Sequence, residues 1–143
     1  MANPGPASAT TIHPQNLATN QAYRLLASAT SVPISATGDA PVTLQVINST
    51  TYNITNVVIT NANKDVSSGA LAIWTGPAGT GTEIVTNASL TSNTSSAYVT
   101  KSTVVSATGT ANLSAQTFYV KVGTAVAGGT VDIYIYGTDF STF

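Results

Sequence analysis

Charged side chains are scarce in this chain of 143 residues, which has 4 Lys or Arg and 5 Asp or Glu. They make up 6 % of the sequence, whereas an average soluble domain carries roughly 25 %. The four cations are too few and too scattered to form the basic stripe that a nucleic-acid backbone requires: Arg24, Lys64, Lys101 and Lys121. The chain also has too few basic side chains for an electrostatic membrane anchor. We therefore expect neither nucleic acid nor a membrane among the partners.

Cysteine is absent, which excludes disulfides, thiolate nucleophiles and Cys-ligated metals. The longest unbroken apolar run, residues 70–74, is far shorter than the roughly 18 to 20 residues that span a bilayer. Residues 1–6 have neither a basic start nor an apolar core, so we expect no secretory signal. These features predict synthesis and folding in a reducing cytoplasm.

Catalytic residue types are also few. The only histidine, His13, lies just before Pro14 in an irregular segment, so no hydrolytic triad is expected. A glycosidase would need two carboxylates about 5 to 10 Å apart in a cleft, and a minor hydrolase of this kind stays open as an alternative. We expect solvated side chains near turns or on polar faces for the five acids: Asp39, Asp65, Glu83, Asp132 and Asp139. With no calcium-binding or phosphate-binding loop motif, the sequence predicts no enzyme, cofactor or metal site.

What the chain does contain is typical of β-structure. Val, Ile, Thr, Tyr, Phe and Trp occupy 58 of the 143 positions, whereas Glu, Arg and Met occur once each. β-Branched side chains lose rotamer freedom on a helix and pack well on a pleated sheet. The composition therefore predicts an all-β protein.

Alternating apolar and polar residues predict individual strands. Val42, Leu44 and Val46 share one face, and a turn is expected at residues 76–79. Other strands are predicted at residues 57–59, 70–75, 83–86, 98–105, 118–122 and 131–136. Seven or eight strands at this spacing indicate a single β-sandwich or jelly-roll-like domain over residues 21–143.

The last two predicted strands flank a Gly-Gly turn at residues 127–129, so residues 117–137 are expected to form a hairpin. Lys121 and Asp132 fall on the polar side of these strands and predict a solvated face. Residues 1–20 differ, because three prolines and no periodicity predict an extended N-terminal arm. That segment is either a frayed terminus or an arm that orders against a neighbouring subunit.

Asparagine and the aromatic residues supply the remaining candidates for modification or binding sites. With 40 Ser or Thr and 11 Asn, chance predicts roughly three Asn-X-Ser/Thr matches, so the five present reflect composition: Asn48, Asn53, Asn87, Asn93 and Asn112. Tyr134 and Tyr136 share one strand face, with Tyr119 expected across from them, as a sugar-binding platform, a subunit interface or simple cross-strand packing. Trp74 lies in an apolar run and is expected in the core.

The surface is predicted to carry Ser, Thr and Asn in place of Lys and Glu. Such a surface has weak colloidal protection when the protein is free, and it is tolerable when copies are held in a fixed assembly. This favours a structural protein over a soluble enzyme.

Residues 113–125 (LSAQTFYVKVGTA) and 128–137 (GGTVDIYIYG) resemble the C-terminal hairpin of the small head decoration, or cement, proteins of tailed bacteriophages. The resemblance covers about 25 residues. It implies a structural virion protein without catalytic residues, bound to the outer surface of the phage capsid. It also implies a homo-oligomer, a trimer being favoured, that bridges major capsid protein subunits and stabilises the shell. The alternative is a receptor- or glycan-binding β-domain of a phage tail fibre or adhesin, using the tyrosine-bearing sheet.

Overall fold

The computed structural model describes residues 23–102, 109 and 111–141. The arm predicted for residues 1–20, His13 and the end of the strand predicted at 98–105 lie outside the described residues. Within these residues, the elements follow in the order β1 (Tyr23–Pro33), β2 (Gly38–Val46), β3 (Tyr52–Thr60), β4 (Ala70–Gly76), the short 3₁₀ turn η1 (Pro77–Gly79), β5 (Thr80–Ser89), β6 (Thr100–Ser102), β7 (Thr117–Thr124) and β8 (Thr130–Asp139). The prediction of an all-β protein is confirmed.

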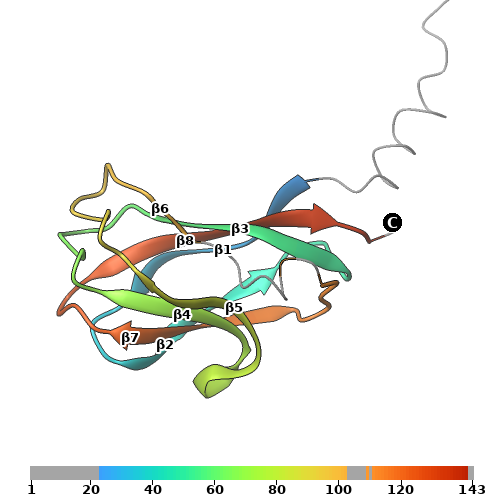
Figure 1. Cartoon of the computed structure of the whole chain (residues 1–143), viewed down its shortest axis with the longest axis horizontal. Helices are drawn as coiled ribbons and strands as arrows, with labels where there is room; N and C mark the ends of the chain where they lie inside the picture. Colours follow the sequence, from blue (N-terminus) through green and yellow to red (C-terminus); the bar gives the residue numbers. More distant parts are fainter. Residues whose placement is uncertain (1–22, 103–108, 110, 142–143) are drawn as a thin grey trace, which may run out of the picture.

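The first four strands pair with the last four in reverse order. β1 pairs with β8, β2 with β7, β3 with β6 and β4 with β5, all antiparallel. Further pairing of β3 with β8, β4 with β7 and β1 with β2 gives one nearly closed sheet in the order β5-β4-β7-β2-β1-β8-β3-β6. A long antiparallel ribbon rolled up in this way is a jelly roll. Figure 1 shows its two layers, β1-β8-β3-β6 above and β5-β4-β7-β2 below.

One hydrophobic core fills the space between the layers. The predicted alternation of apolar residues is confirmed on β7 and β8, where the apolar side chains at every second position are buried: Phe118, Val120, Val122, Val131, Ile133 and Ile135. Tyr52 of β3 and Phe118 of β7 meet edge to face, with ring centroids 6.0 Å apart. The Tyr52 hydroxyl donates a hydrogen bond to the Ala115 carbonyl, and burial raises the pKa of this phenol. Strands from both layers are therefore joined through the same core.

The predicted hairpin at residues 117–137 is wrong. The turn at Gly128 is present, with a φ of 66° that glycine tolerates, but β7 pairs with β2 and β4 while β8 pairs with β1 and β3. The connection therefore crosses from one layer to the other. The reason is topological: in a rolled ribbon, consecutive strands often belong to opposite sheets.

The turn predicted at residues 76–79 is confirmed, and it makes β4 and β5 a true hairpin. Its backbone needs the left-handed region twice, at Ala78 (φ 56°) and Gly79 (φ 76°). The β4–β5 pairing contains three register shifts. These bulges are typical of an edge strand and redirect side chains: Ile84 and Val85 of β5 are both buried, and the next two residues, Thr86 and Asn87, are both exposed.

Candidate functional site

Two of the five acids predicted to be solvated are buried, and both lie on β8. Asp132 is 6 % exposed and Asp139 is 3 % exposed. Seven residues of extended chain, about 23 Å, separate them. The structure therefore does not bring these two carboxylates together in the way that a glycosidase requires.

Asp139 joins the end of β8 to the loop between β2 and β3. Its Oδ1 accepts hydrogen bonds from the Ser49 hydroxyl (2.7 Å) and the Ser141 N–H (2.9 Å), and its Oδ2 lies 3.3 Å from Arg24 Nη1. Burial by itself raises the pKa of this carboxyl, but the hydrogen bonds from Ser141 and Ser49 and the charge of Arg24 hold it below its ordinary value. Both carboxylate oxygens therefore have partners. We call this set of interactions the Asp139 clamp, because it links the end of β8 to β1 and to the loop between β2 and β3.

Asp132 fixes two strained backbone positions. Its Oδ1 accepts from the Ser31 N–H (2.7 Å) and its Oδ2 from the Asn61 Nδ2 (2.8 Å). Ser31 (φ 54°) and Asn61 (φ 52°) both have left-handed backbone conformations, which are unfavourable for side chains other than glycine. The prediction that Asp132 lies on a solvated face is therefore wrong, because a bulge in β1 folds over it.

The other three acids are dispersed over the surface. Asp39 of β2 accepts a hydrogen bond from the Ala78 N–H (2.6 Å). Hydrogen bonds from Ser67, through its hydroxyl and its backbone N–H, hold the pKa of Asp65 below its ordinary value. Glu83 lies on β5, separated from β2 by two strands. The described part of the chain contains no group of three or more acidic or histidine side chains that could hold a metal ion.

The tyrosines fall on two different layers. Tyr134 and Tyr136 share the outer face of β8, but Tyr119 is on β7 in the other layer, so its predicted place across from them is wrong. Tyr136 instead stacks on Tyr23 of β1, with ring centroids 6.2 Å apart and planes 13° from parallel. Leu25 pairs directly with Tyr136. We call Tyr23, Leu25, Tyr134 and Tyr136 the tyrosine patch.

Two Asn-X-Ser/Thr matches have structural roles. Asn93 is completely buried, where its amide donates to the carbonyls of Ile59 and Tyr98 (both 3.2 Å) and accepts from the Thr100 hydroxyl. Asn53 donates to the carbonyl of Gly109 at 2.6 Å. These amides hold loops against β3, so buried or partly buried hydrogen bonds account for the two asparagines.

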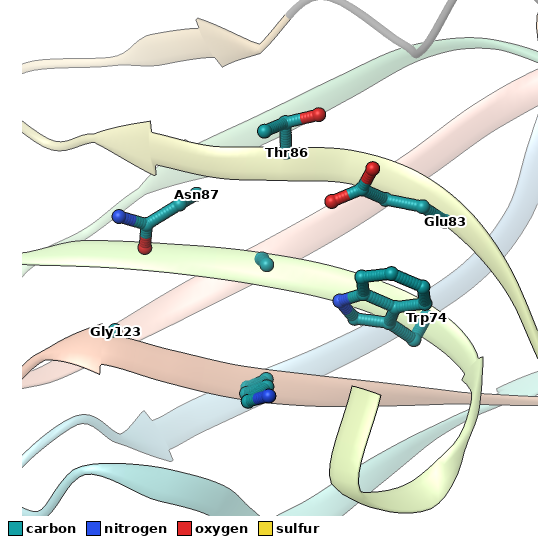
Figure 2. A pocket seen from close by; sticks show the side chains of 7 residues that line it. Trp74, Glu83, Thr86, Asn87 and Gly123 are labelled. Carbon is teal, nitrogen blue, oxygen red and sulfur yellow. The ribbon is translucent and has the colours of Figure 1, made fainter. Parts of the chain in front are cut away.

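A hollow lies on the outer face of the β5-β4-β7-β2 layer (Figure 2). It has a volume of about 260 Å³ and is lined by residues of three strands: Ala72 and Trp74 of β4, Glu83, Thr86 and Asn87 of β5, and Lys121 and Gly123 of β7. Trp74 is only partly buried and lies beside this pocket, so its predicted place in the core is wrong. The preceding residue, Ile73, points inward, and alternation then turns Trp74 outward.

The pocket is held in shape by its neighbours. Lys121 Nζ donates to the Ala78 carbonyl of η1 at 3.4 Å, which tethers it to the β4–β5 turn. A Cβ atom on Gly123 would lie 2.0 Å from Asn87 Oδ1. Gly123 therefore leaves the space that the Asn87 amide occupies. Figure 2 shows that amide above Gly123 and the Trp74 indole beneath the Glu83 carboxylate.

A second, more polar hollow of about 420 Å³ lies near Asn61, Asn63 and Lys64. Its amide and ammonium groups already bond within the protein. Asn63 Nδ2 donates to the Gly128 carbonyl (2.9 Å), and Lys64 Nζ donates to the Ala127 carbonyl (3.1 Å). Side-chain hydrogen bonds therefore join neighbouring loops at this hollow. The hollow beside Trp74, which we call the Trp74 pocket, is the better candidate site.

The sequence does not predict the Trp74 pocket, because its residues come from three strands and their proximity depends on how those strands pair in the fold.

Among the described residues, no helix has the length and apolar character needed to cross a membrane. Comparisons with protein-family models, with curated proteins and with solved structures found no match to this chain.

Proposed function

We propose that the protein is a structural virion protein that binds the outer surface of a phage capsid and bridges major capsid protein subunits. It is made in the host cytoplasm and acts as a homo-oligomer, with a trimer favoured. The resemblance of residues 113–137 to phage decoration proteins motivates the proposal, and these residues include β7 and β8. The jelly roll is compatible with it, because this fold is common among viral capsid domains.

The tyrosine patch is the observation that carries the proposal. Tyr23 is 60 % exposed and Leu25 is 38 % exposed, on the outer face of the β1-β8-β3-β6 layer. Exposed apolar side chains grouped in this way mark interaction surfaces. Tyrosine is also enriched at protein interfaces, while Lys and Glu are depleted there.

The rigid jelly roll suits a bridging role. A standard interface buries roughly 800 Å² on each partner. One copy that contacts two capsid subunits links them, and an oligomer multiplies such links without new contact types. Many modest contacts then sum over a closed shell and oppose its expansion.

Co-sedimentation with undecorated capsids, assembled from the major capsid protein of the same genome, tests the proposal. We expect binding by the wild-type protein and at least about tenfold weaker binding by the Tyr23→Ser/Leu25→Ser variant. Tyr98→Ser is the matched control, because Tyr98 is 55 % exposed but lies outside the patch. Absence of wild-type binding would refute the proposal, and equal loss in the control would remove the patch from it.

A glycan-binding β-domain of a tail fibre or adhesin is the second candidate, favoured by Tyr134 and Tyr136 on one outer face. The jelly roll also occurs in lectin domains. A glycan-array signal that disappears in Tyr134→Ala would favour this candidate over capsid binding.

A further inference from the structure

We propose that the Trp74 pocket binds one neutral pyranose ring of a carbohydrate. This site lies on the layer opposite the tyrosine patch and does not depend on capsid attachment. Four features of the pocket support this assignment: its apolar floor, its polar rim, its volume and its preformed shape.

The floor of the pocket suits the C–H face of a sugar. Trp74 supplies an indole ring, and Ala72, two residues earlier on β4, supplies a methyl group on the same face. An indole combines a large apolar surface with one N–H donor. The Trp74 Nε1 is buried and has no acceptor among the described residues, and buried donors are normally paired. Figure 2 shows this nitrogen edge turned toward the other side chains of the pocket. Because the nitrogen is shielded from solvent, the sugar would contact the face of the indole ring and not its N–H.

The rim carries the groups that bind hydroxyls. Glu83 can accept hydrogen bonds, Lys121 can donate them, and the Asn87 amide can do both. Sugar hydroxyls also donate and accept, so such a mixed rim matches neighbouring hydroxyls on one ring. One carboxylate and one ammonium balance each other, which favours a neutral sugar over a phosphate or sulfate group.

The volume of about 260 Å³ limits the ligand to a small one. Sites for drug-sized molecules usually enclose about 300 to 1,000 Å³. The pocket therefore fits a single ring, such as the end of a surface glycan.

The pocket is also preformed. The β5 bulges turn both Thr86 and Asn87 outward, and Gly123 leaves the room for the Asn87 amide. Ala at position 123 would displace the amide, which is the far end of a flexible side chain, and would leave the backbone in place. Gly123→Ala is thus a change in pocket shape that keeps Trp74, Glu83 and Lys121.

A titration with methyl glycosides of glucose, galactose, mannose and N-acetylglucosamine tests the site. Trp74 is the only tryptophan in the chain, so its indole N–H resonance and fluorescence report on this pocket alone. We expect at least one glycoside to shift that resonance saturably. Calorimetry should then give a Kd at least tenfold higher for Trp74→Ala and for Gly123→Ala, and unchanged for Tyr134→Ala on the other layer.

Thermal unfolding of each variant checks that the fold is retained, and Gly123→Ala keeps the test decisive if Trp74→Ala is unstable. The proposal is refuted if none of the glycosides shifts the indole resonance when each is added to about 50 mM. This concentration is roughly the highest dissociation constant of interest for a single ring. It is equally refuted if binding survives both pocket variants, or if Tyr134→Ala abolishes it. Capsid attachment is measured separately, so its loss or retention leaves this result interpretable.

Discussion

At the residue scale, two of the few ionised side chains are buried and bond to other parts of the protein. Asp132 and Asp139 are both buried, and each receives hydrogen bonds from elements far away in sequence. Burying a carboxylate is costly unless it is paired or hydrogen-bonded. A chain with only five acids that buries two of them therefore uses its charges as clamps between strands and loops.

The Asp139 clamp makes stability depend on acid pH. The folded-state pKa of Asp139 is below its ordinary value of 3.8, so the unfolded chain takes up the proton first as the pH falls. The stabilisation is complete above the unfolded value and is lost as the pH falls through the lower folded value. At pH 7 we expect Asp139→Asn to lower the free energy of unfolding by about 1 to 3 kcal/mol. This difference from wild type should shrink toward pH 2.

Urea denaturation at a series of pH values measures both effects. Asp39→Asn is the control, because Asp39 is exposed and asparagine keeps a side-chain oxygen that can accept from the Ala78 N–H. Its replacement should change the free energy of unfolding by less than about 0.5 kcal/mol. A difference between wild type and Asp139→Asn that stays constant from pH 7 to pH 2 would contradict the clamp.

At the scale of elements, the close approach of β3 and β8 depends on Gly137. A Cβ atom at this position would lie 1.8 Å from the Asn53 carbonyl oxygen and 2.7 Å from Leu26 Cδ1. The bulge between Ile54 and Asn56 brings the β3 backbone this near. We expect Gly137→Ala to destabilise the protein by more than about 3 kcal/mol, because backbone must move to admit the methyl group.

Gly128→Ala separates steric from conformational effects. No atom lies within 4 Å of a Cβ at Gly128, but its φ is positive, so the cost should be about 1 to 2 kcal/mol. Thermal or urea unfolding compares the two variants. Equal stability losses would show that β3 and β8 are not closely packed at Gly137.

The sequence predicts strands well where alternation is regular and poorly where bulges interrupt it. On β7, Phe118, Val120 and Val122 alternate with outward residues, and this strand was placed correctly. β1 was not predicted, because its apolar residues are adjacent (Leu25 and Leu26) and two register shifts break the period of two. The β7–β8 hairpin was predicted wrongly, because local turn chemistry does not specify which distant strand becomes the partner.

The candidate site was predictable only in part. Strict alternation after Ile73 would have placed Trp74 outside, but the apolar run around it favoured the core. Nothing local relates Glu83 and Asn87 to Gly123, because the β5 bulges and the β4–β7 pairing create their proximity. A site assembled from three strands requires the register of all three.

At the scale of the whole molecule, the two layers present different outer faces. One carries the tyrosine patch, and the other carries the Trp74 pocket with Glu83 and Lys121. Both faces are available at once, because the layers lie back to back across one core (Figure 1). Under the proposed function, a bound copy would contact the capsid with one face and present the other to solvent.

Capsid attachment through the tyrosine patch should depend little on salt. Ionic contacts are screened within about 10 Å at 0.1 M salt and about 3 Å at 1 M, whereas burial of apolar area is not screened. The whole chain has 4 Lys or Arg and a net charge of −1, so long-range steering contributes little. We expect the Kd for undecorated capsids to change by less than about threefold between 0.05 and 0.5 M NaCl. Sedimentation at each salt concentration measures this, and a loss of tenfold or more would assign the attachment to charged side chains.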